Sequence, residues 1–343
     1  MTFTKSINIY KGSFKHFFLS LVFLGLIYGC EKEIVVELPE SEVLLVVEGR
    51  IEGDGVSKTP PFILLSRSSG YFDVTSIADM ENLQVHDAVI TIRVDNIDYP
   101  LEELCIPDLT FLPDSLQLLV AGFLGIGIEG LASFNYCFYT VPIADLISGN
   151  YLYGIPGKTY YLTIESEGAT YTSKTKVPNL VPLANVWFEV SKDDSLGFAW
   201  AHLEDPDTIG NAYRWYAKRL GTDFQGNLKD EGYLPPAGSA IEDEFFNGKS
   251  FDFGFDRGHL PGNHEENDPS EVSHYFKTTD TIAIKFCTID YDVYRYLRVY
   301  EIEVNSAGSP FASPSTIPTN IEGGGLGLWA GYGVTYDTIF GVK

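Results

Sequence analysis

Hydrophobic and polar residues alternate along much of the chain, and this pattern predicts β-strands. In the run 85–94, Ile90, Ile92 and Val94 alternate with Thr91, the period-two pattern of a strand with one buried face. Similar runs, rich in β-branched and aromatic residues, recur along the chain. They cover residues 43–51, 61–67, 159–165, 170–177, 185–190, 196–201, 212–220, 250–255, 280–289 and 328–336.

Turn residues divide these strands into two groups. Glu167-Gly168 separates two of the runs and predicts a β-hairpin. Pro178 and Pro182 follow, where a strand ladder would be interrupted. The length of 343 residues also exceeds what one β-domain usually needs. We therefore predict a mainly β protein with two β-sandwich-like domains, of the immunoglobulin or fibronectin III kind, at 43–180 and 181–343.

A different period follows Asp290. Val293, Leu297, Tyr300 and Val304 recur at spacings of four, three and four residues. This is the period of an amphipathic helix, and Asp290 is a suitable N-cap residue for it. We therefore expect one short helix in the C-terminal half of the chain.

The N-terminus has the pattern of a secretory signal. Lys5, Lys11 and Lys15 form a basic region without acidic residues, and the apolar block 17–28 follows it. This block is shorter than the roughly 20 residues that span a bilayer as a helix. We therefore predict that residues 1–29 are a signal peptide and not a permanent membrane span.

Cys30 directly follows this block and Gly29, as in the bacterial lipobox, although Tyr28 is bulkier than the usual residue there. We predict that Cys30 is acylated and becomes the mature N-terminus, and that the acidic segment 30–42 is a tether leading away from the lipid. Two or more acyl chains hold a protein stably on a membrane. The alternative is a secreted protein in which Cys30 is an ordinary cysteine.

The charge balance excludes one class of partner. Subtracting the three lysines of the leader from 23 Lys and Arg leaves 20, against 47 Asp and Glu, so the mature net charge is −27. Phosphate backbones and anionic lipid surfaces repel such a chain. We therefore expect no nucleic-acid partner, and interpret the spread acidic residues as a solvated surface.

Three cysteines remain after the leader, and three pairings are possible. We favour a Cys105–Cys137 disulfide, because both flank an apolar, glycine-spaced segment at 118–131 and an exported chain meets oxidising conditions. Cys287 lies in an alternating strand pattern, which predicts a buried thiol. The segment 118–131 is either an extra buried hairpin or an exposed patch for a partner.

Catalytic motifs are scarce. The G-x-S-x-G elbow is absent, and the sequence after His264 places Asp268 where a zincin needs its second histidine. We expect no enzyme activity, no catalytic residues and no cofactor.

A polar region at 221–273 gathers oxygen and imidazole ligands that could bind calcium or a transition metal, although a solvated loop explains them better. These weak metal candidates are Asp252, Asp256, His259, His264 and Glu265.

The tryptophans have two interpretations. Exposed, they could stack against sugars; alternating within strands, they more often pack in a core. The core interpretation is favoured for all four, which are Trp187, Trp200, Trp215 and Trp329.

A family resemblance covers nearly the whole mature chain, and it is carried by the order of several short motifs. These are Cys30-Glu31-Lys32-Glu33, Leu45-Val46-Val47-Glu48-Gly49, Asp87-Ala88-Val89-Ile90, Pro156-Gly157-Lys158-Thr159, Asp205-Pro206-Asp207, Asn211-Ala212-Tyr213-Arg214, Tyr294-Arg295-Tyr296-Leu297, Ser309-Pro310-Phe311-Ala312 and Asn320-Ile321-Glu322-Gly323-Gly324. The chain thus resembles a Bacteroidetes lipoprotein family known only as domain of unknown function 4249.

The resemblance implies a location and a partner. It implies a lipid-anchored outer-membrane protein facing the cell surface, beside a TonB-dependent receptor of the SusC-like type. The expected function is that of a non-catalytic accessory subunit that captures a substrate for nutrient uptake. The alternative is a surface adhesin or glycan-binding module. The resemblance transfers no catalytic residue.

Overall fold

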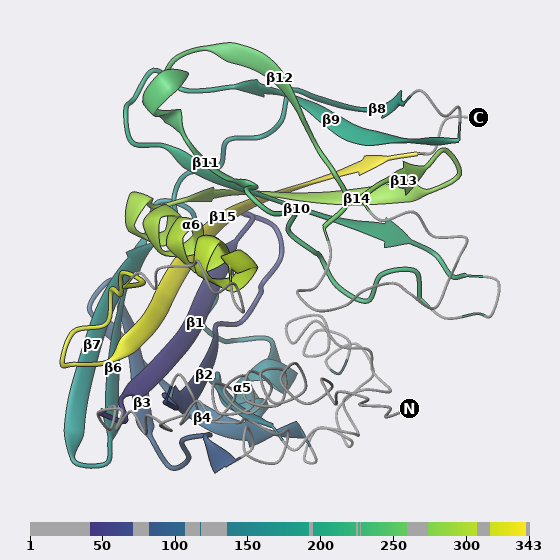
Figure 1. Ribbon diagram of the computed structural model, residues 1–343. Helices are drawn as coiled ribbons and strands as arrows, with labels where there is room; N and C mark the ends of the chain where they lie inside the picture. Colours follow the sequence, from purple (N-terminus) through teal and green to yellow (C-terminus); the bar gives the residue numbers. More distant parts are fainter. Residues whose placement is uncertain are drawn as a thin grey trace, which may run out of the picture. The chain divides into compact units, whose positions relative to one another are not determined.

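The computed structural model describes residues 42–70, 82–106, 117, 136–191, 195–223, 226, 228–258, 274–306 and 316–340. From Glu42 onward the chain forms one compact unit (Figure 1). The predicted signal peptide, Cys30, almost all of the tether and all of segment 118–131 lie outside the described residues.

The predicted mainly β class is confirmed. In the N-terminal half the elements are β1 (Leu45–Gly53), β2 (Phe62–Arg67), β3 (Val89–Val94), β4 (Ile97–Cys105), β5 (Cys137–Thr140), α5 (Ile143–Ser148), β6 (Thr159–Ser166) and β7 (Ala169–Lys176). In the C-terminal half they are β8 (Asn185–Val190), β9 (Leu196–Glu204), β10 (Ala212–Leu220), β11 (Ala240–Glu242), η2 (Asp243–Phe245), β12 (Ser250–Phe255), β13 (Phe276–Lys277), β14 (Thr281–Ile289), α6 (Tyr291–Ser306) and β15 (Leu326–Ile339).

The expected hairpin joins β6 to β7. Glu167 has a φ of 54° and Gly168 a φ of 81°, so both turn residues adopt the positive φ that a tight two-residue hairpin requires. The strands pair in register from Thr159 with Lys176 to Ser166 with Ala169. The turn residues therefore set the register of this hairpin.

One long sheet runs through both halves of the chain. Its strand order is β11-β10-β14-β15-β1-β2-β5-β4-β3-β6-β7. The long strand β15 joins the halves, because it pairs in parallel with β1 through Leu326 to Gly333 and antiparallel with β14 through Tyr332 to Ile339. A second sheet consists of β8, β9, β12 and β13. Figure 1 shows β15 passing between the two regions.

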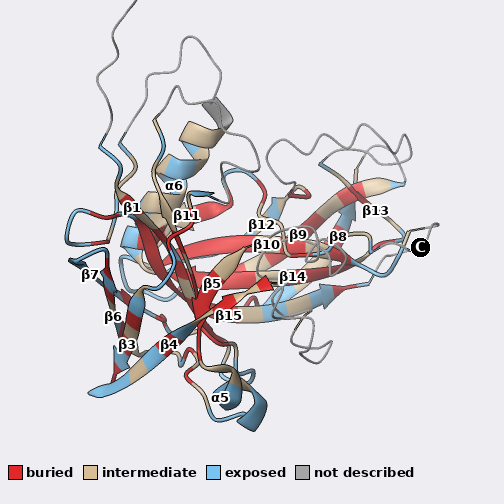
Figure 2. Cartoon of the chain, turned by 90° about the horizontal axis from the view of Figure 1, so that it is seen from below, coloured by how far each residue is buried: buried red, intermediate tan, exposed pale blue. Residues whose placement is uncertain are grey.

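Two hydrophobic cores give the fold a sandwich-like arrangement. One lies between β1 and β2 and the strands β3 and β6, with Trp329 of β15 buried at its centre. A Cβ atom on Gly49 would lie 2.6 Å from the Trp329 ring, so this close packing requires glycine. The other core lies between the small sheet and β10 and β14. Figure 2 shows the buried residues concentrated along the central strands.

Residues on the two sides of the predicted boundary at residue 180 belong to different cores. Val177 belongs to the first core and Val181 to the second, but β15 contributes Trp329 to one and Ile339 to the other. The two halves thus share a sheet, and their division into two domains stays a prediction.

The predicted helix forms as α6 and covers one face of the long sheet. Val293 packs with Leu328 and Val334 of β15 in a third buried cluster. Arg214 of β10 forms an ion pair with Glu301 of the helix, and both side chains are almost buried. Asp290 precedes the helix as expected, and its carboxylate accepts a hydrogen bond from the backbone N–H of Lys176, 3.1 Å away.

Candidate functional site

The face of the long sheet that carries α6 also carries a row of polar side chains. Strand alternation directs Lys218 and Tyr216 of β10 to this face, while Trp215 and Ala217 enter the core on the other side. The register then aligns residues of three neighbouring strands. Tyr216 lies opposite Lys285 of β14, and Lys285 lies opposite Tyr336 of β15.

These side chains line a cavity of about 550 Å³, which we call the Lys285 cavity. Its floor comes from β1, β10, β14 and β15, and Leu228 and residues 230–233 contribute to its wall. Such a volume falls within the roughly 300–1,000 Å³ of small-molecule sites. The lining residues are Arg50, Glu52, Thr59, Tyr216, Lys218, Arg219, Leu220, Gly221, Leu228, Asp230, Glu231, Gly232, Tyr233, Lys285, Tyr332 and Tyr336.

A buried ion pair lies at the floor of the cavity. Lys285 Nζ is 2.7 Å from both carboxylate oxygens of Glu52. Burial alone would raise the pKa of Glu52, but the charges of Lys285 and Arg50 outweigh it and lower the pKa. Burial likewise acts to lower the pKa of Lys285, and Glu52 reverses this and raises it. Both groups therefore stay charged near neutral pH.

A second ion pair fixes the wall. The Arg219 guanidinium donates to both oxygens of Asp230, with Nη2 2.7 Å from Oδ1, and the backbone N–H of Arg219 donates to Oδ2 at 2.6 Å. Both side chains are almost completely buried. Lys229 next to Asp230 pairs with the buried Asp280 at 2.8 Å. Bidentate, buried contacts of this kind hold the wall residues in one geometry.

Four tyrosines supply the remaining polar lining. The ring centroids of Tyr233 and Tyr336 are 5.9 Å apart, and Tyr216 of β10 and Tyr332 of β15 also line the cavity. Burial raises the pKa of each hydroxyl above its ordinary value, so all four remain protonated. Within the described part of the chain, none of these hydroxyls forms a hydrogen bond. Each can therefore donate to a ligand.

Lys218 has no carboxylate partner among the residues that the structure describes. Its Nζ lies 4.8 Å from the centroid of the Tyr233 ring, a cation–π contact. No ion pair among the described residues includes it, because the nearby Asp230 is held by Arg219. Burial lowers the pKa of Lys218, and Asp230 offsets part of this effect.

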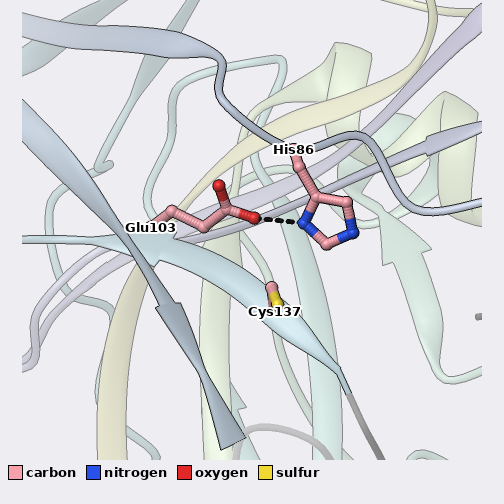
Figure 3. Close-up of side chains that lie close together, drawn as sticks. All are labelled: His86, Glu103 and Cys137. Atoms are coloured by element: carbon pink, nitrogen blue, oxygen red, sulfur yellow. Dashed lines mark hydrogen bonds and ion pairs between the residues drawn. The ribbon is translucent and has the colours of Figure 1, made fainter. Parts of the chain in front are cut away.

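A second cluster contains metal-ligand types but lacks a free thiolate. His86 Nδ1 lies 2.5 Å from Glu103 Oε1, and the sulfur of Cys137 is close to both groups (Figure 3). That sulfur forms a disulfide with Cys105. Because metals bind cysteine as thiolate, the cluster in this form offers only two good ligands.

The disulfide is the pairing expected from the sequence. Cys105 and Cys137 lie directly opposite each other on β4 and β5, with Cα atoms 3.9 Å apart. Cys287 is a buried free thiol, as its strand pattern predicted. Burial raises the pKa of this thiol to about 12, which keeps it protonated and unreactive.

The weak metal candidates are only partly described. Asp252 of β12 interacts with Nδ1 of His202 at 2.5 Å, and Asp256 interacts with Nδ1 of His274 at 3.0 Å. The two aspartates are four residues apart on an extended chain, about 13 Å, and each has its own histidine. They do not form one site with each other. The other three candidates, His259, His264 and Glu265, lie outside the described residues.

The tryptophans divide evenly between core and surface. Trp215 and Trp329 are fully buried, as the core interpretation predicts. Trp187 and Trp200 are half-buried and face each other across β8 and β9, with ring centroids 6.2 Å apart. Because their strand neighbours Phe188 and Ala201 enter the core, these two rings lie on the outer face of the small sheet. For this pair the core prediction was wrong.

The sequence offered little signal for the Lys285 cavity. Alternation in β10 and β14 indicated which residues share a face, but it gave no reason to join Tyr216 and Lys218 with Lys285 in one site. Glu52 and Lys285 are 233 residues apart and meet because β15 pairs with both β1 and β14. A polar residue inside an otherwise apolar strand, such as Lys285 in TIAIKFCTI, was the one available signal.

The fold and the cavity define a mainly β protein with a charged, tyrosine-lined pocket. A family model described as "Domain of unknown function (DUF4249)" matches residues 31–338, and the chain belongs to this family. A search of curated proteins found no match. Among the helices that the structure describes, none is both long and apolar enough to cross a membrane.

Proposed function

We propose that this protein is a non-catalytic outer-membrane lipoprotein that captures a small polar solute in the Lys285 cavity for a SusC-like TonB-dependent receptor. One observation carries the capture step. Four tyrosine hydroxyls and the Lys218 ammonium line one cavity without a hydrogen-bonding or ion-pair partner in the described protein. Convergent, unsatisfied polar groups in a preformed cavity are typical of a ligand site.

The protonation states support binding rather than chemistry. Glu52 is held ionised by Lys285 and Arg50, and the tyrosines are held protonated by burial. A general base or a nucleophile needs a pKa close to the working pH, or a partner that activates it. The pKa values of Glu52, Lys285 and the four tyrosines are instead shifted away from neutrality, with the lowered pKa of Lys218 as the exception.

The N-terminal sequence supports the membrane attachment. A basic and apolar leader ends at Cys30, and acyl chains on this residue would supply membrane affinity to an otherwise strongly acidic chain. Anchoring next to a receptor would also raise the local concentration of captured solute at the receptor mouth.

Affinity purification from native membranes tests the partnership. The tagged lipoprotein is solubilised in mild detergent, and co-purifying proteins are identified by mass spectrometry. A TonB-dependent β-barrel receptor is expected with the wild type and not with a Cys30→Ser variant, which lacks the anchor. Recovery of the intact lipoprotein without any such receptor would refute the proposal.

A glycan-binding adhesin is the second candidate, and the outer face of the small sheet favours it. Trp187 and Trp200 stack there, and a Cβ atom on Gly254 would lie 2.8 Å from the Trp200 ring, so the ring lies flat against the neighbouring strand. Flat aromatic surfaces can bind the apolar faces of sugars. On a glycan array, Trp200→Ala should lose binding that the control Phe245→Ala retains. An array without signals for the wild type would exclude this candidate.

A further inference from the structure

We infer that the Lys285 cavity selects a small polyhydroxylated carboxylate, the chemical class of the sugar acids. This inference rests on the proposed capture function and specifies its ligand. It follows from three properties of the cavity, which are its local charge, the single unpaired ammonium and the hydroxyl-rich lining.

The local charge has the opposite sign to that of the whole protein. The lining contains four cations and three anions, a surplus of one positive charge, whereas the full chain has a net charge of −24. The cations are Arg50, Lys218, Arg219 and Lys285, and the anions are Glu52, Asp230 and Glu231. A ligand with one negative charge would neutralise the cavity, whereas a dianion would leave a charge uncompensated in an acidic protein.

Lys218 is the position for the ligand carboxylate. Its ammonium is partly buried and so loses part of its hydration, without a counter-ion to compensate. The contact with the Tyr233 ring replaces this hydration only in part. A carboxylate next to Nζ would form a charge-assisted hydrogen bond and raise the lowered pKa of this lysine. The Lys285 and Arg219 charges are already matched by Glu52 and Asp230, so they offer less to a ligand.

The tyrosines define the rest of the ligand. Their four hydroxyls can each donate or accept, which suits a body with several hydroxyl groups. The inclined rings of Tyr233 and Tyr336 offer flat surfaces for the C–H face of a sugar ring. A purely apolar acid would leave these hydroxyls without partners after it displaced water.

Calorimetric titration of the mature lipoprotein in detergent micelles tests this assignment. The probes are galacturonate, the neutral galactose and the dianionic galactose 6-phosphate. Galacturonate should bind at least ten-fold more tightly than either of the other two. In Lys218→Met, the affinity for galacturonate should exceed that for galactose by less than three-fold. Tyr336→Phe should lower the affinities for both sugars together. The control Lys158→Met, in an exposed lysine paired with Asp95, should change neither affinity.

The outcomes separate this inference from the proposed function. Equal affinity for galactose and galacturonate, or tighter binding of the phosphate, would overturn the inference while leaving solute capture intact. A preference for galacturonate that survives in Lys218→Met would also overturn it, because the ammonium would not be the anchor. Absence of binding by all three probes would exclude the sugar-acid class, and receptor co-purification would still decide the partnership. Thermal unfolding of each variant verifies that it is folded.

Discussion

Removing one partner of the buried Glu52–Lys285 pair should strongly destabilise the protein. Both side chains are about nine-tenths buried, and Lys285 Nζ contacts both oxygens of Glu52 at 2.7 Å. Glu52→Gln keeps the shape of the side chain and removes its charge. The substitution leaves the Lys285 ammonium buried beside Arg50 without its counter-ion, which is costly in a medium of low polarity.

The free energy of unfolding should fall by about 3–5 kcal/mol, the range observed when one partner of a buried ion pair is removed. With a urea m-value of about 3 kcal/mol per M, the midpoint should fall by roughly 1–2 M. Replacing both partners, as in Glu52→Gln with Lys285→Met, should recover most of this loss, because the Lys285 ammonium is no longer left without its counter-ion.

The pH dependence gives a second, independent readout. In the wild type the lowered pKa of Glu52 contributes stability above its ordinary value of 4.5, and this contribution is lost as pH falls through the lowered pKa. The raised pKa of Lys285 contributes stability below 10.5, which is lost as pH rises through the raised pKa. In Glu52→Gln, burial and Arg50 should lower the pKa of Lys285, so this variant should gain stability as pH rises towards 10.5.

Urea unfolding between pH 5 and 10 measures the loss of stability in Glu52→Gln and its expected gain as pH rises, over a range in which both wild-type contributions stay constant. The control Lys158→Met removes an exposed lysine paired with Asp95 and should cost less than about 1 kcal/mol. A Glu52→Gln loss no larger than that of the control would refute the burial argument. A double variant as unstable as Glu52→Gln would refute the role of the orphaned charge.

Reduction of the Cys105–Cys137 disulfide should lower the free energy of unfolding by about 3–4 kcal/mol, given a sequence separation of 32 residues. Urea curves with and without reductant measure this, and identical curves would count against it. Cys287 should resist alkylation in the folded protein because burial raises its pKa to about 12; mass addition as rapid as in urea would be inconsistent with that. Cys30→Ser should abolish incorporation of labelled palmitate and move the protein out of the membrane fraction, whereas unchanged membrane recovery would disprove the lipid anchor.

Local patterns predicted the strands well because one face of each strand is buried. In β14, alternate residues from Ile282 to Phe286 enter a core, and the same alternation is visible in the sequence. β4 was missed because Pro100 and several carboxylates interrupt its pattern; the strand is held by pairing with β3 and β5 on either side. β5 is only four residues long and has too few positions to show a period.

The candidate site could not be predicted because it depends on contacts between distant strands. Glu52 and Lys285 come together through the pairing of β15 with both β1 and β14, and Tyr216 joins them through the pairing of β10 with β14. The sequence also gave no basis for separating Trp200 from Trp215, since both occupy alternating strands. Their difference follows from which face of each strand meets a core, and that is a property of the assembled sheets.

The small-molecule content of the protein purified from native membranes most directly tests solute capture by the Lys285 cavity. The wild type and a Lys218→Met, Tyr336→Phe double variant are purified in parallel, denatured, and their extracts compared by mass spectrometry. The wild type should release close to one equivalent of a small hydroxylated acid that is absent from the double variant. Identical extracts from the two folded proteins would show that the cavity does not capture a solute.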